Sequence, residues 1–544
     1  MRATDVLRSA LMGIVEEMGL NWPAKAVIEP PRDPKHGDLA ANIAMLLARE
    51  AHKNPRELAQ IFVEKLPQRC ADIEKVEVAG PGFCNVTFSQ HFWRKTVCEV
   101  EAAGAAYGQS SVGQGRKTLV EYVSANPTGP LHVGHGRGAA VGDSLARLLR
   151  KAGFDVETEY YINDAGRQMR ILGLSVWLRV KELAGRPVEW PEDYYRGSEM
   201  LAEDPSLPDM EDQAGQDRCY ERAMNEILDG IKADLANFRV EHQHWFSEKT
   251  LVESGAVKAA FDALTEAGHT FDKDGAFWFA TQALGDDKDR VLRKSDGSLT
   301  YFASDIAYHH NKFQRGYDWL IDIWGADHHG YVPRMRAAIT AMGKPRESFD
   351  VVLIQLVNLL QGGKPVSMST RAGTFETLAD VVKEVGADAA RFMFLSRKSD
   401  TSLDFDLELA KQRSLDNPVY YVQYAHARIC AVLRRAEERG ITLPAAATDE
   451  LLAALDTPED MALLRKMAGF EDMVATAAQA LAVHHVSHYL MDLAGMLHSY
   501  YAKHQVLLAD DTARTLSRLA LLRAVSQVLR NGLDLLGVSA PEAM

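Results

Sequence analysis

The sequence of 544 residues has few cysteines and no C-x-x-C pair. Its five cysteines are scattered along the chain, at Cys70, Cys84, Cys98, Cys219 and Cys430. A disulfide framework or a thiolate zinc site needs closer and more regular spacing. We therefore expect reduced thiols and no zinc site.

Long apolar runs are also absent. The most apolar stretch, 351–360, is much shorter than the ~20 residues that a membrane helix needs. The first residues mix Asp5, Glu16 and Glu17 into an amphipathic helical pattern, which lacks the apolar centre of a secretory signal. These features predict a cytoplasmic protein without a membrane partner.

Positive charge is not in excess, because 61 lysines and arginines stand against 75 aspartates and glutamates, a net charge of −14. This balance excludes nonspecific polyanion binding over the whole surface, but it leaves room for RNA on a local basic face. The length predicts about three domains, since a domain usually has about 100 to 200 residues.

The most distinctive segment is 125–138, A-N-P-T-G-P-L-H-V-G-H-G-R-G. A strand pattern at 118–124 precedes it, apolar residues at helical spacing follow it, and 156–162 indicates a second strand. This order predicts a right-handed βαβ unit with His132 and His135 at the N-terminus of its helix. The free N–H groups of that end favour phosphate, and both rings can donate to a triphosphate as charge moves onto the leaving group.

A dinucleotide site is the competing interpretation. Gly134, Gly136 and Ala139 fit the G-x-G-x-x-A fingerprint, and Glu157 and Glu159 follow where a ribose-binding acid is expected. In that fingerprint the first glycine directly follows the strand, whereas a long segment with prolines intervenes here. We interpret Gly134 instead as room for a flat group, such as adenine, against the backbone. Two surface histidines on a glycine-rich loop are the simplest structural explanation.

The rest of the chain divides by its patterns. Residues 1–112 indicate an N-terminal α+β domain, with helical patterns at 5–20, 38–52 and 55–66 before a strand pair at 75–79 and 83–88. Residues 118–404 predict an α/β domain with a doubly wound parallel sheet, a helical insertion at about 165–270, and later strands at 277–280, 319–324 and 351–357. From 405 to 544 the pattern is helical throughout, which predicts an all-α helix bundle.

Polar residues follow the strand expected at 319–324, at the edge where such sheets bind ligands. They include Gly325, Asp327 and His328. Adjacent histidines rarely point at one ion, so we interpret this segment as nucleotide contacts rather than metal ligands.

The loop at 361–373 follows the next expected strand and is flanked by glycines. It carries Lys364 and Arg371, which suits transient neutralisation of a triphosphate by a closing loop. A solvated surface hairpin has the same pattern.

Tyr301 and Asp305 are four residues apart and share one face of an expected helix. Beside a nucleotide site such a carboxylate can hold a guanidinium through two hydrogen bonds. Glu121, within the strand at 118–124, is a second acid in the expected neighbourhood.

The first C-terminal helix mixes aromatic and basic residues, among them Tyr421, Tyr424 and Arg428. Such a helix can stack on single-stranded RNA and neutralise its phosphates. An ordinary helix with a core face and a solvent face shows the same pattern.

Together these segments resemble the class I aminoacyl-tRNA synthetases, and specifically the arginyl-tRNA synthetase family, over essentially the whole chain. Segment 125–138 is similar to the family's H-I-G-H signature. The stretches W-G-A-D-H-H-G at 324–330 and D-N-P-V-Y-Y-V-Q-Y-A-H-A-R at 416–428 are more specific. Residues 367–371 stand where the family has its K-M-S-K-S-type loop.

The resemblance implies a Rossmann-type catalytic domain between an N-terminal domain that touches the D-loop of tRNA and a helical anticodon-binding domain. It also implies a two-step reaction. L-Arginine attacks ATP, bound with Mg²⁺, to give arginyl-adenylate and pyrophosphate, and a ribose hydroxyl of the terminal adenosine of tRNA(Arg) then takes the arginyl group. We expect a monomer that requires bound tRNA before it activates arginine.

The residue roles that the resemblance implies fall into groups. The catalytic group is His132, His135 and Arg371, and the arginine site comprises Glu121, Ser124, Asn126, Tyr301 and Asp305. The ATP site comprises Gly134, Gly325, Asp327, His328, Met368 and Ser369, and the tRNA contacts are Phe83, Asn85, Tyr421, Tyr424 and Arg428.

One departure from the family pattern concerns lysine. Ser367 and Thr370 occupy the two lysine positions of the K-M-S-K-S-type loop. We hypothesise that Arg371, helped by Lys364, supplies the missing cation. The alternatives are a different class I synthetase and a tRNA-binding paralogue without catalysis. A nucleotidyltransferase that shares H-x-G-H is disfavoured by the long helical C-terminal part.

Overall fold

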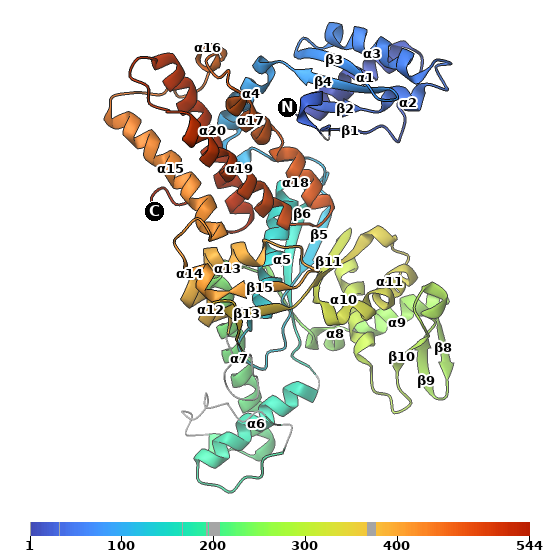
Figure 1. The fold of residues 1–544 in the computed structure, drawn as a ribbon. Coiled ribbons are helices and arrows are strands. Elements are labelled where there is room, and N and C mark those ends of the chain that lie inside the picture. Colours follow the sequence, from blue (N-terminus) through green and yellow to red (C-terminus); the bar gives the residue numbers. More distant parts are fainter. Residues whose placement is uncertain (1, 32, 166, 192–193, 195–206, 367–376) are drawn as a thin grey trace.

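A computed structural model describes the chain except for residues 1, 32, 166, 192–193, 195–206 and 367–376. A parallel sheet with its helices occupies the middle of the molecule, with the N-terminal sheet and the C-terminal helices towards one end (Figure 1). The α6–α7 pair projects at the opposite end. Within the described ranges, no helix is both long and apolar enough to cross a membrane.

The N-terminal domain is an antiparallel sheet with helices. Its strands pair in the order β1-β2-β4-β3 and are β1 (Ile28–Glu29), β2 (Leu39–Ala41), β3 (Ile73–Ala79) and β4 (Phe83–Phe88). Its helices are α1 (Ala3–Glu17), α2 (Ile43–Leu47), α3 (Pro55–Arg69) and α4 (Gln90–Ala103). The expected strand pair is present. The helix expected over 38–52 is wrong in its first part, because residues 39–41 pair with β4.

The central sheet is parallel, in the order β12-β11-β5-β6-β7. Its strands are β5 (Lys117–Glu121), β6 (Asp155–Ile162), β7 (His244–Ser247), β11 (Trp319–Gly325) and β12 (Phe349–Ile354). The predicted βαβ unit is confirmed, since α5 (Val133–Lys151) connects β5 to β6 and these two strands pair directly. The strand order reverses at β5, so the segments after β5 and β11 share the edge where such sheets bind ligands.

The strand expected at 277–280 does not join this sheet. It overlaps β9 (Ala276–Phe279), which pairs in an antiparallel sheet with β8 (Thr270–Lys273) and β10 (Arg290–Arg293). The strand that follows the long helices into the parallel sheet is β7. Its residues are only half-buried, so its sequence lacks the apolar run of a buried parallel strand.

The strand expected at 351–357 is two strands. β12 ends at Ile354, and β13 (Val357–Gln361) belongs to a separate sheet with β14 (Lys364–Pro365) and β15 (Leu403–Asp406). The break between β12 and β13 could not be seen in the sequence, because both strands bury apolar residues and together form one apolar run.

The other helices belong to the central part of the chain or form the C-terminal bundle. Those of the central part are α6 (Arg167–Leu183), α7 (Asp212–Asn237), α8 (Lys249–Glu253), α9 (Ala256–Glu266), α10 (Tyr301–Gln314), α11 (Val332–Ala341), α12 (Leu378–Val385), α13 (Ala387–Phe394) and α14 (Leu407–Lys411). The bundle comprises α15 (Pro418–Glu438), α16 (Asp449–Leu452), α17 (Pro458–Ala468), α18 (Phe470–Gln479), α19 (His484–Lys503) and α20 (Thr512–Leu535). One apolar core runs from α5 through α13 into the bundle. The predicted fold class is therefore confirmed.

Candidate active site

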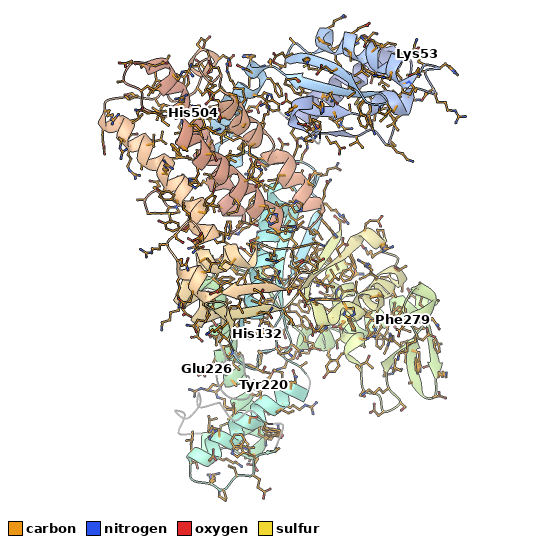
Figure 2. The ribbon with its side chains drawn as sticks, in the orientation of Figure 1. Lys53, His132, Tyr220, Glu226, Phe279 and His504 are labelled. Carbon is orange, nitrogen blue, oxygen red and sulfur yellow. The ribbon has the colours of Figure 1, made fainter. Side chains whose placement is uncertain are left out.

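His132 and His135 lie at the start of α5, where each ring caps the other residue's backbone. The His132 ring accepts the N–H of Gly134 (3.1 Å) and of His135 (3.3 Å), and the His135 ring accepts the N–H of His132 (3.2 Å). The rings stack with their centroids 3.6 Å apart. Because Nδ1 of each ring accepts, each neutral ring carries its proton on Nε2. Figure 2 shows His132 between the central sheet and the α6–α7 pair.

Burial keeps both imidazoles uncharged. It lowers the pKa of His132, and burial together with the neighbouring His132 ring lowers the pKa of His135 to about 3. At neutral pH the pair offers N–H donors beside the positive end of a helix dipole. Such preorganised donors stabilise negative charge that develops during a reaction.

Gly134 makes room for the histidine pair itself. A Cβ at this position would lie 3.0 Å from Cε1 of His132. The sequence predicts that the space beside Gly134 holds a flat ligand. In the structure the His132 imidazole lies next to this space.

The first residue described after the loop with the missing lysines lies against this turn. Met368, Ser369 and Arg371 lie outside the described residues. Thr377, the first described residue after them, forms an antiparallel bridge with His132. The chain is thus held against the histidine pair where it enters α12.

Glu121, at the end of β5, is buried and already engaged. Its carboxylate accepts a hydrogen bond from Ser124 Oγ (2.9 Å) and forms an ion pair with Lys312 of α10. Val123 and Ser124 have φ angles of 70° and 39°, a conformation that a β-branched residue rarely adopts. This strained turn brings Ser124 back onto Glu121.

Tyr301 and Asp305 lie in the first turns of α10. The Tyr301 side chain is 75% exposed, so a ligand can reach it. Asp305 is half-buried and accepts a hydrogen bond from the hydroxyl of Tyr331. Burial raises the pKa of Asp305.

Glu248, directly after β7, is an acid that the sequence analysis missed. Ser304 and Tyr161 hydrogen-bond to its carboxylate, and burial followed by the charge of Asp305 raises the pKa of Glu248. No lysine or arginine in the described part of the chain forms an ion pair with Asp305 or Glu248. The two neighbouring carboxylates repel each other, which disfavours their charged forms. Because β7 has no apolar pattern, the sequence did not indicate that Glu248 follows a strand of the parallel sheet.

The other residues predicted at this edge are more exposed. The Nδ2 group of Asn126 donates to Oε1 of Gln168 (3.1 Å). Gly325 ends β11, and the side chains of Asp327 and His328 follow it in an exposed ion-pair geometry with N and O 3.5 Å apart. The ends of the paired strands β5 and β11 thus bring Ser124 and Asn126 to the same edge of the sheet as Asp327 and His328.

The dinucleotide interpretation does not hold, because its two acids have protein partners. Glu157 accepts hydrogen bonds from Tyr317 and pairs with His244 (2.6 Å). Glu159 is fully buried and holds the guanidinium of Arg315. Glu159 is therefore closed to a ribose, and Glu157 would have to exchange its protein partners for one.

The predicted RNA residues of the N-terminal domain lie on β4. Asn85 is 9% exposed and stands between β2 and β3, while Phe83 is half-buried. Both positions are compatible with ordinary strand residues, and their role in RNA binding stays a prediction.

The predicted RNA residues of α15 meet aromatic residues of α19. The Tyr421 and Tyr424 rings flank His498, with centroids 4.6 Å and 5.9 Å from it. The Arg428 guanidinium lies 4.2 Å from the ring centre of Tyr501. A cavity of about 400 Å³ opens beside this pair and is also lined by Arg435, Arg439 and His504.

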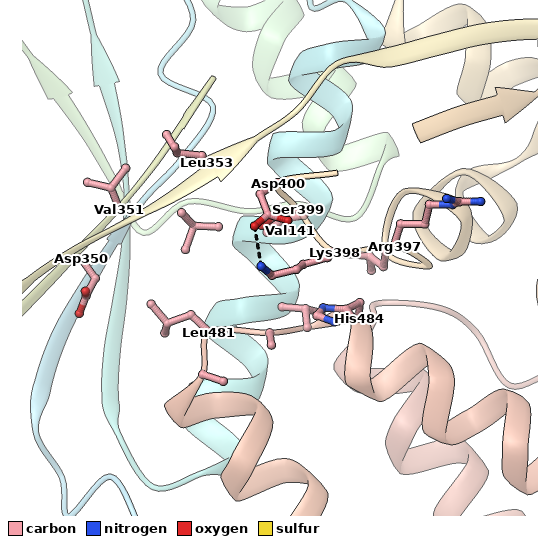
Figure 3. Close-up of a pocket in the computed structure, with 15 residues that line it drawn as sticks. Val141, Asp350, Val351, Leu353, Arg397, Lys398, Ser399, Asp400, Leu481 and His484 are labelled. Carbon is pink, nitrogen blue, oxygen red and sulfur yellow. Dashed lines mark hydrogen bonds and ion pairs between the residues drawn. The ribbon is translucent and has the colours of Figure 1, made fainter. Parts of the chain in front are cut away.

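Another cavity, of about 260 Å³, lies between β12, residues 397–400 and the start of α19 (Figure 3). Lys398 and Asp400 form an ion pair at its wall (2.5 Å). None of the predicted site residues lines it. Across the described ranges, no cluster of histidine, cysteine, aspartate or glutamate has the arrangement of a metal site.

Three models of known protein families together match most of the chain. The arginyl-tRNA synthetase N-terminal domain matches residues 3–88, the class I (R) tRNA synthetase catalytic domain matches residues 96–406, and the DALR anticodon-binding domain matches residues 422–544.

Individual relatives agree with these matches. Over the whole of both chains, this protein is 76% identical to an arginine–tRNA ligase of Desulfovibrio desulfuricans and 65% identical to one of Nitratidesulfovibrio vulgaris. The structure of Thermus thermophilus arginyl-tRNA synthetase has the same fold, with a TM-score of 0.77, 24% identity and all of both chains covered. The chain belongs to the arginyl-tRNA synthetase family.

Proposed function

We propose that this chain is an ATP-dependent arginine–tRNA ligase whose reaction takes place at the edge of the central sheet. The family assignment and the names of the curated relatives support this activity. The observation that carries the proposal is one of placement. Glu248, which follows β7 and neighbours Asp305, lies at the same edge of the sheet as the stacked rings of His132 and His135, which follow β5.

The guanidinium of arginine would bring a positive charge directly between these two carboxylates. It is planar and can hydrogen-bond to more than one carboxylate at once, so it suits Asp305 and Glu248, with the exposed Tyr301 beside them. Ser124 and Asn126 hold the α-groups at the other end of the substrate. Glu121 contributes through Ser124, because its own oxygens already contact Ser124 and Lys312.

The chemical step needs positioning and charge stabilisation rather than a covalent enzyme intermediate. A carboxylate oxygen of arginine attacks the α-phosphorus of ATP, and the bond to pyrophosphate breaks. His132 and His135 donate from Nε2 to the phosphate oxygens as charge develops. A ribose hydroxyl of tRNA then attacks the arginyl carbonyl, and AMP leaves with the bonding electrons.

The remaining roles concern ATP and tRNA. ATP binds together with its Mg²⁺, and Arg371 places a positive charge near the triphosphate. The residues that line the ATP site are Gly134, Gly325, Asp327, His328, Met368 and Ser369. The RNA is contacted through Phe83, Asn85, Tyr421, Tyr424 and Arg428. The α15–α19 cavity, which combines arginines with Tyr501, fits an unstacked base and its phosphate.

ATP–pyrophosphate exchange, run with each amino acid in the presence and absence of tRNA(Arg), tests the activity. Exchange is expected with arginine and with no other amino acid. Exchange with a different amino acid would identify another class I synthetase, and no exchange even with tRNA would identify a paralogue without catalysis.

Two substitutions test the arginine site. Asp305→Asn and Glu248→Gln are each expected to raise KM for arginine about tenfold or more, because a charge-assisted hydrogen bond is lost. KM for ATP should stay within about twofold. Glu253→Gln, an exposed glutamate that ends α8, is the matched control and should change neither constant. Unchanged arginine KM in both site variants would contradict the assignment.

We further propose domains at 1–112, 118–404 and 405–544, in a cytoplasmic monomer. Of the insertion expected at about 165–270, the helical part ends before β7, which belongs to the central sheet. Light scattering of the full chain should give a mass near 60.2 kDa. Twice that mass at low micromolar concentration would contradict the monomer.

A further inference from the structure

A row of buried carboxylates lies beneath the arginine site. Glu159 on β6, Glu121 on β5 and Asp322 on β11 are register partners on adjacent strands, so their side chains stand side by side on one face of the sheet. Glu159 and Asp322 are almost fully buried, at 0% and 1% exposure. Like charges in such a row repel each other unless cations lie between them.

Helix α10 supplies those cations. Nζ of Lys312, itself 0% exposed, lies 2.9 Å from Oδ1 of Asp322 and donates to Oε2 of Glu121. Arg315, one turn later, holds Glu159 through both of its terminal nitrogens, at 2.5 Å and 2.7 Å. Burial opposes the charge of Lys312, but the carboxylates of Asp322, Glu121 and Glu159 raise its pKa, so it stays protonated.

Lys312 is connected to both ends of the arginine site. Through Glu121 it reaches Ser124, whose hydroxyl donates to that carboxylate at 2.9 Å. Through Asp322 it reaches His309, whose Nε2 lies 2.8 Å from Asp322 and whose Nδ1 lies 2.8 Å from the backbone carbonyl of Asp305. One ammonium group therefore joins the turn after β5 to the part of α10 that carries Asp305.

We propose that Lys312 is a positioning residue for arginine, which sets the separation between Ser124 and Asp305 without touching the substrate. The inference rests on the proposed function, in which Ser124 binds the α-groups and Asp305 binds the guanidinium. A fixed separation between these two ends selects an amino acid by the length of its side chain. Lys312 thus contributes to specificity as well as to affinity.

Lys312→Met is the first test, because methionine has similar length without the charge. KM for arginine in pyrophosphate exchange is expected to rise about tenfold, with KM for ATP within about twofold. Discrimination between arginine and homoarginine, which is one methylene longer, should fall by a similar factor. Lys312→Arg, which can still bridge two carboxylates, should recover most of both losses. Lys258→Met, an exposed lysine on α9, is the matched control.

A double variant separates positioning from folding. Lys312→Met leaves Glu121 and Asp322 unbalanced, and adding Asp322→Asn restores the net charge of the cluster. The double variant is expected to unfold close to the wild-type temperature but to keep the raised arginine KM and the reduced homoarginine discrimination. A stable double variant with wild-type values for both would overturn the inference.

The Asp305→Asn variant distinguishes the two possible failures. If Asp305→Asn leaves arginine KM unchanged, the proposed arginine site is wrong and the positioning role falls with it. If Asp305→Asn raises arginine KM while the Lys312 double variant behaves as wild type, only the role of Lys312 is wrong.

Discussion

His132 and His135 cap each other, since each ring accepts the backbone N–H of the other residue. A reciprocal cap of this kind is usually built from serine or threonine and a glutamate. Here the capping groups and the groups proposed to donate to phosphate belong to the same two rings. A change that disturbs the turn therefore disturbs the chemistry.

Gly134→Ala should separate activity from stability. Alanine is favoured over glycine in a helix by up to about 1 kcal/mol, but its Cβ would lie 3.0 Å from Cε1 of His132 and displace the ring. We expect kcat for pyrophosphate exchange to fall at least about tenfold, because small displacements of reacting groups are costly. The melting temperature should change much less than kcat, because the gain in helix propensity offsets the cap hydrogen bonds lost with the ring.

Gly138→Ala, in the same helix, is the control for that prediction. No atom lies within 4 Å of the place that a Cβ would take at Gly138, so this variant should gain stability and keep its activity. Equal effects of the two substitutions on kcat would show that the fit around His132 does not matter.

Acid should destabilise the protein through His135. The pKa of His135 is about 3 in the folded chain, below the ordinary value of 6.5, so the unfolded chain binds more protons between these values. The stabilising contribution is complete above pH 6.5 and is lost as the pH falls towards 3, by up to about 1.4 kcal/mol per pH unit.

Denaturant titrations at pH 7 and pH 5.5 measure this effect. His135→Asn keeps a side-chain acceptor for the cap but does not titrate. From pH 7 to pH 5.5 the wild type should lose about 1 kcal/mol more unfolding free energy than the variant. Equal losses in the two proteins would assign the acid sensitivity to other groups.

Arg371→Ala tests whether an arginine replaces the missing loop lysines. A cation on the triphosphate stabilises the charge that develops on pyrophosphate, so its loss should slow arginine activation about tenfold or more. Lys364→Ala, on the exposed β14, should have a smaller effect. Activation within about twofold of wild type, well under 1 kcal/mol on the rate scale, would exclude this role for Arg371.

Arg391 ties the bundle to the helix that begins with the histidine pair. It is fully buried, donates to the carbonyl of Leu536 (2.7 Å) and to that of Phe238 (3.0 Å), and forms an ion pair with Asp143 of α5. Arg391→Met should cost about 3–5 kcal/mol of unfolding free energy, because two buried carbonyls lose their donor and Asp143 keeps only its ion pair with Arg147.

Chemical denaturation of three variants checks this prediction. Arg397→Met, an exposed arginine in the segment after α13, should change stability by less than about 0.5 kcal/mol. Adding Asp143→Asn to Arg391→Met should recover part of the loss. No recovery would show that the carbonyl contacts of Arg391, rather than its charge, carry the effect.

Much of the fold could be predicted because its signals are local. The strand at 118–124, the helix after it and the strand at 156–162 follow from apolar spacing within a few residues of each other, and the histidines at the helix start follow from the same pattern. β7 could not be found in this way, because its stability comes from pairing with β6 rather than from an apolar pattern of its own. Glu248 was missed with it.

The sequence by itself determined the family, the α/β class and the helix N-terminus that carries the histidines, because these depend on residue order and spacing over short stretches. Only the tertiary structure decided which charged groups have partners inside the protein. Arg137, inside the same motif, is buried and donates to the carbonyls of Gln355, Lys398 and Thr401. Glu121 is bound to Lys312, which lies 191 positions further along the chain. Such partners come into contact only when distant strands and helices pack together. A charged group is buried only where the fold provides hydrogen-bond partners or an opposite charge.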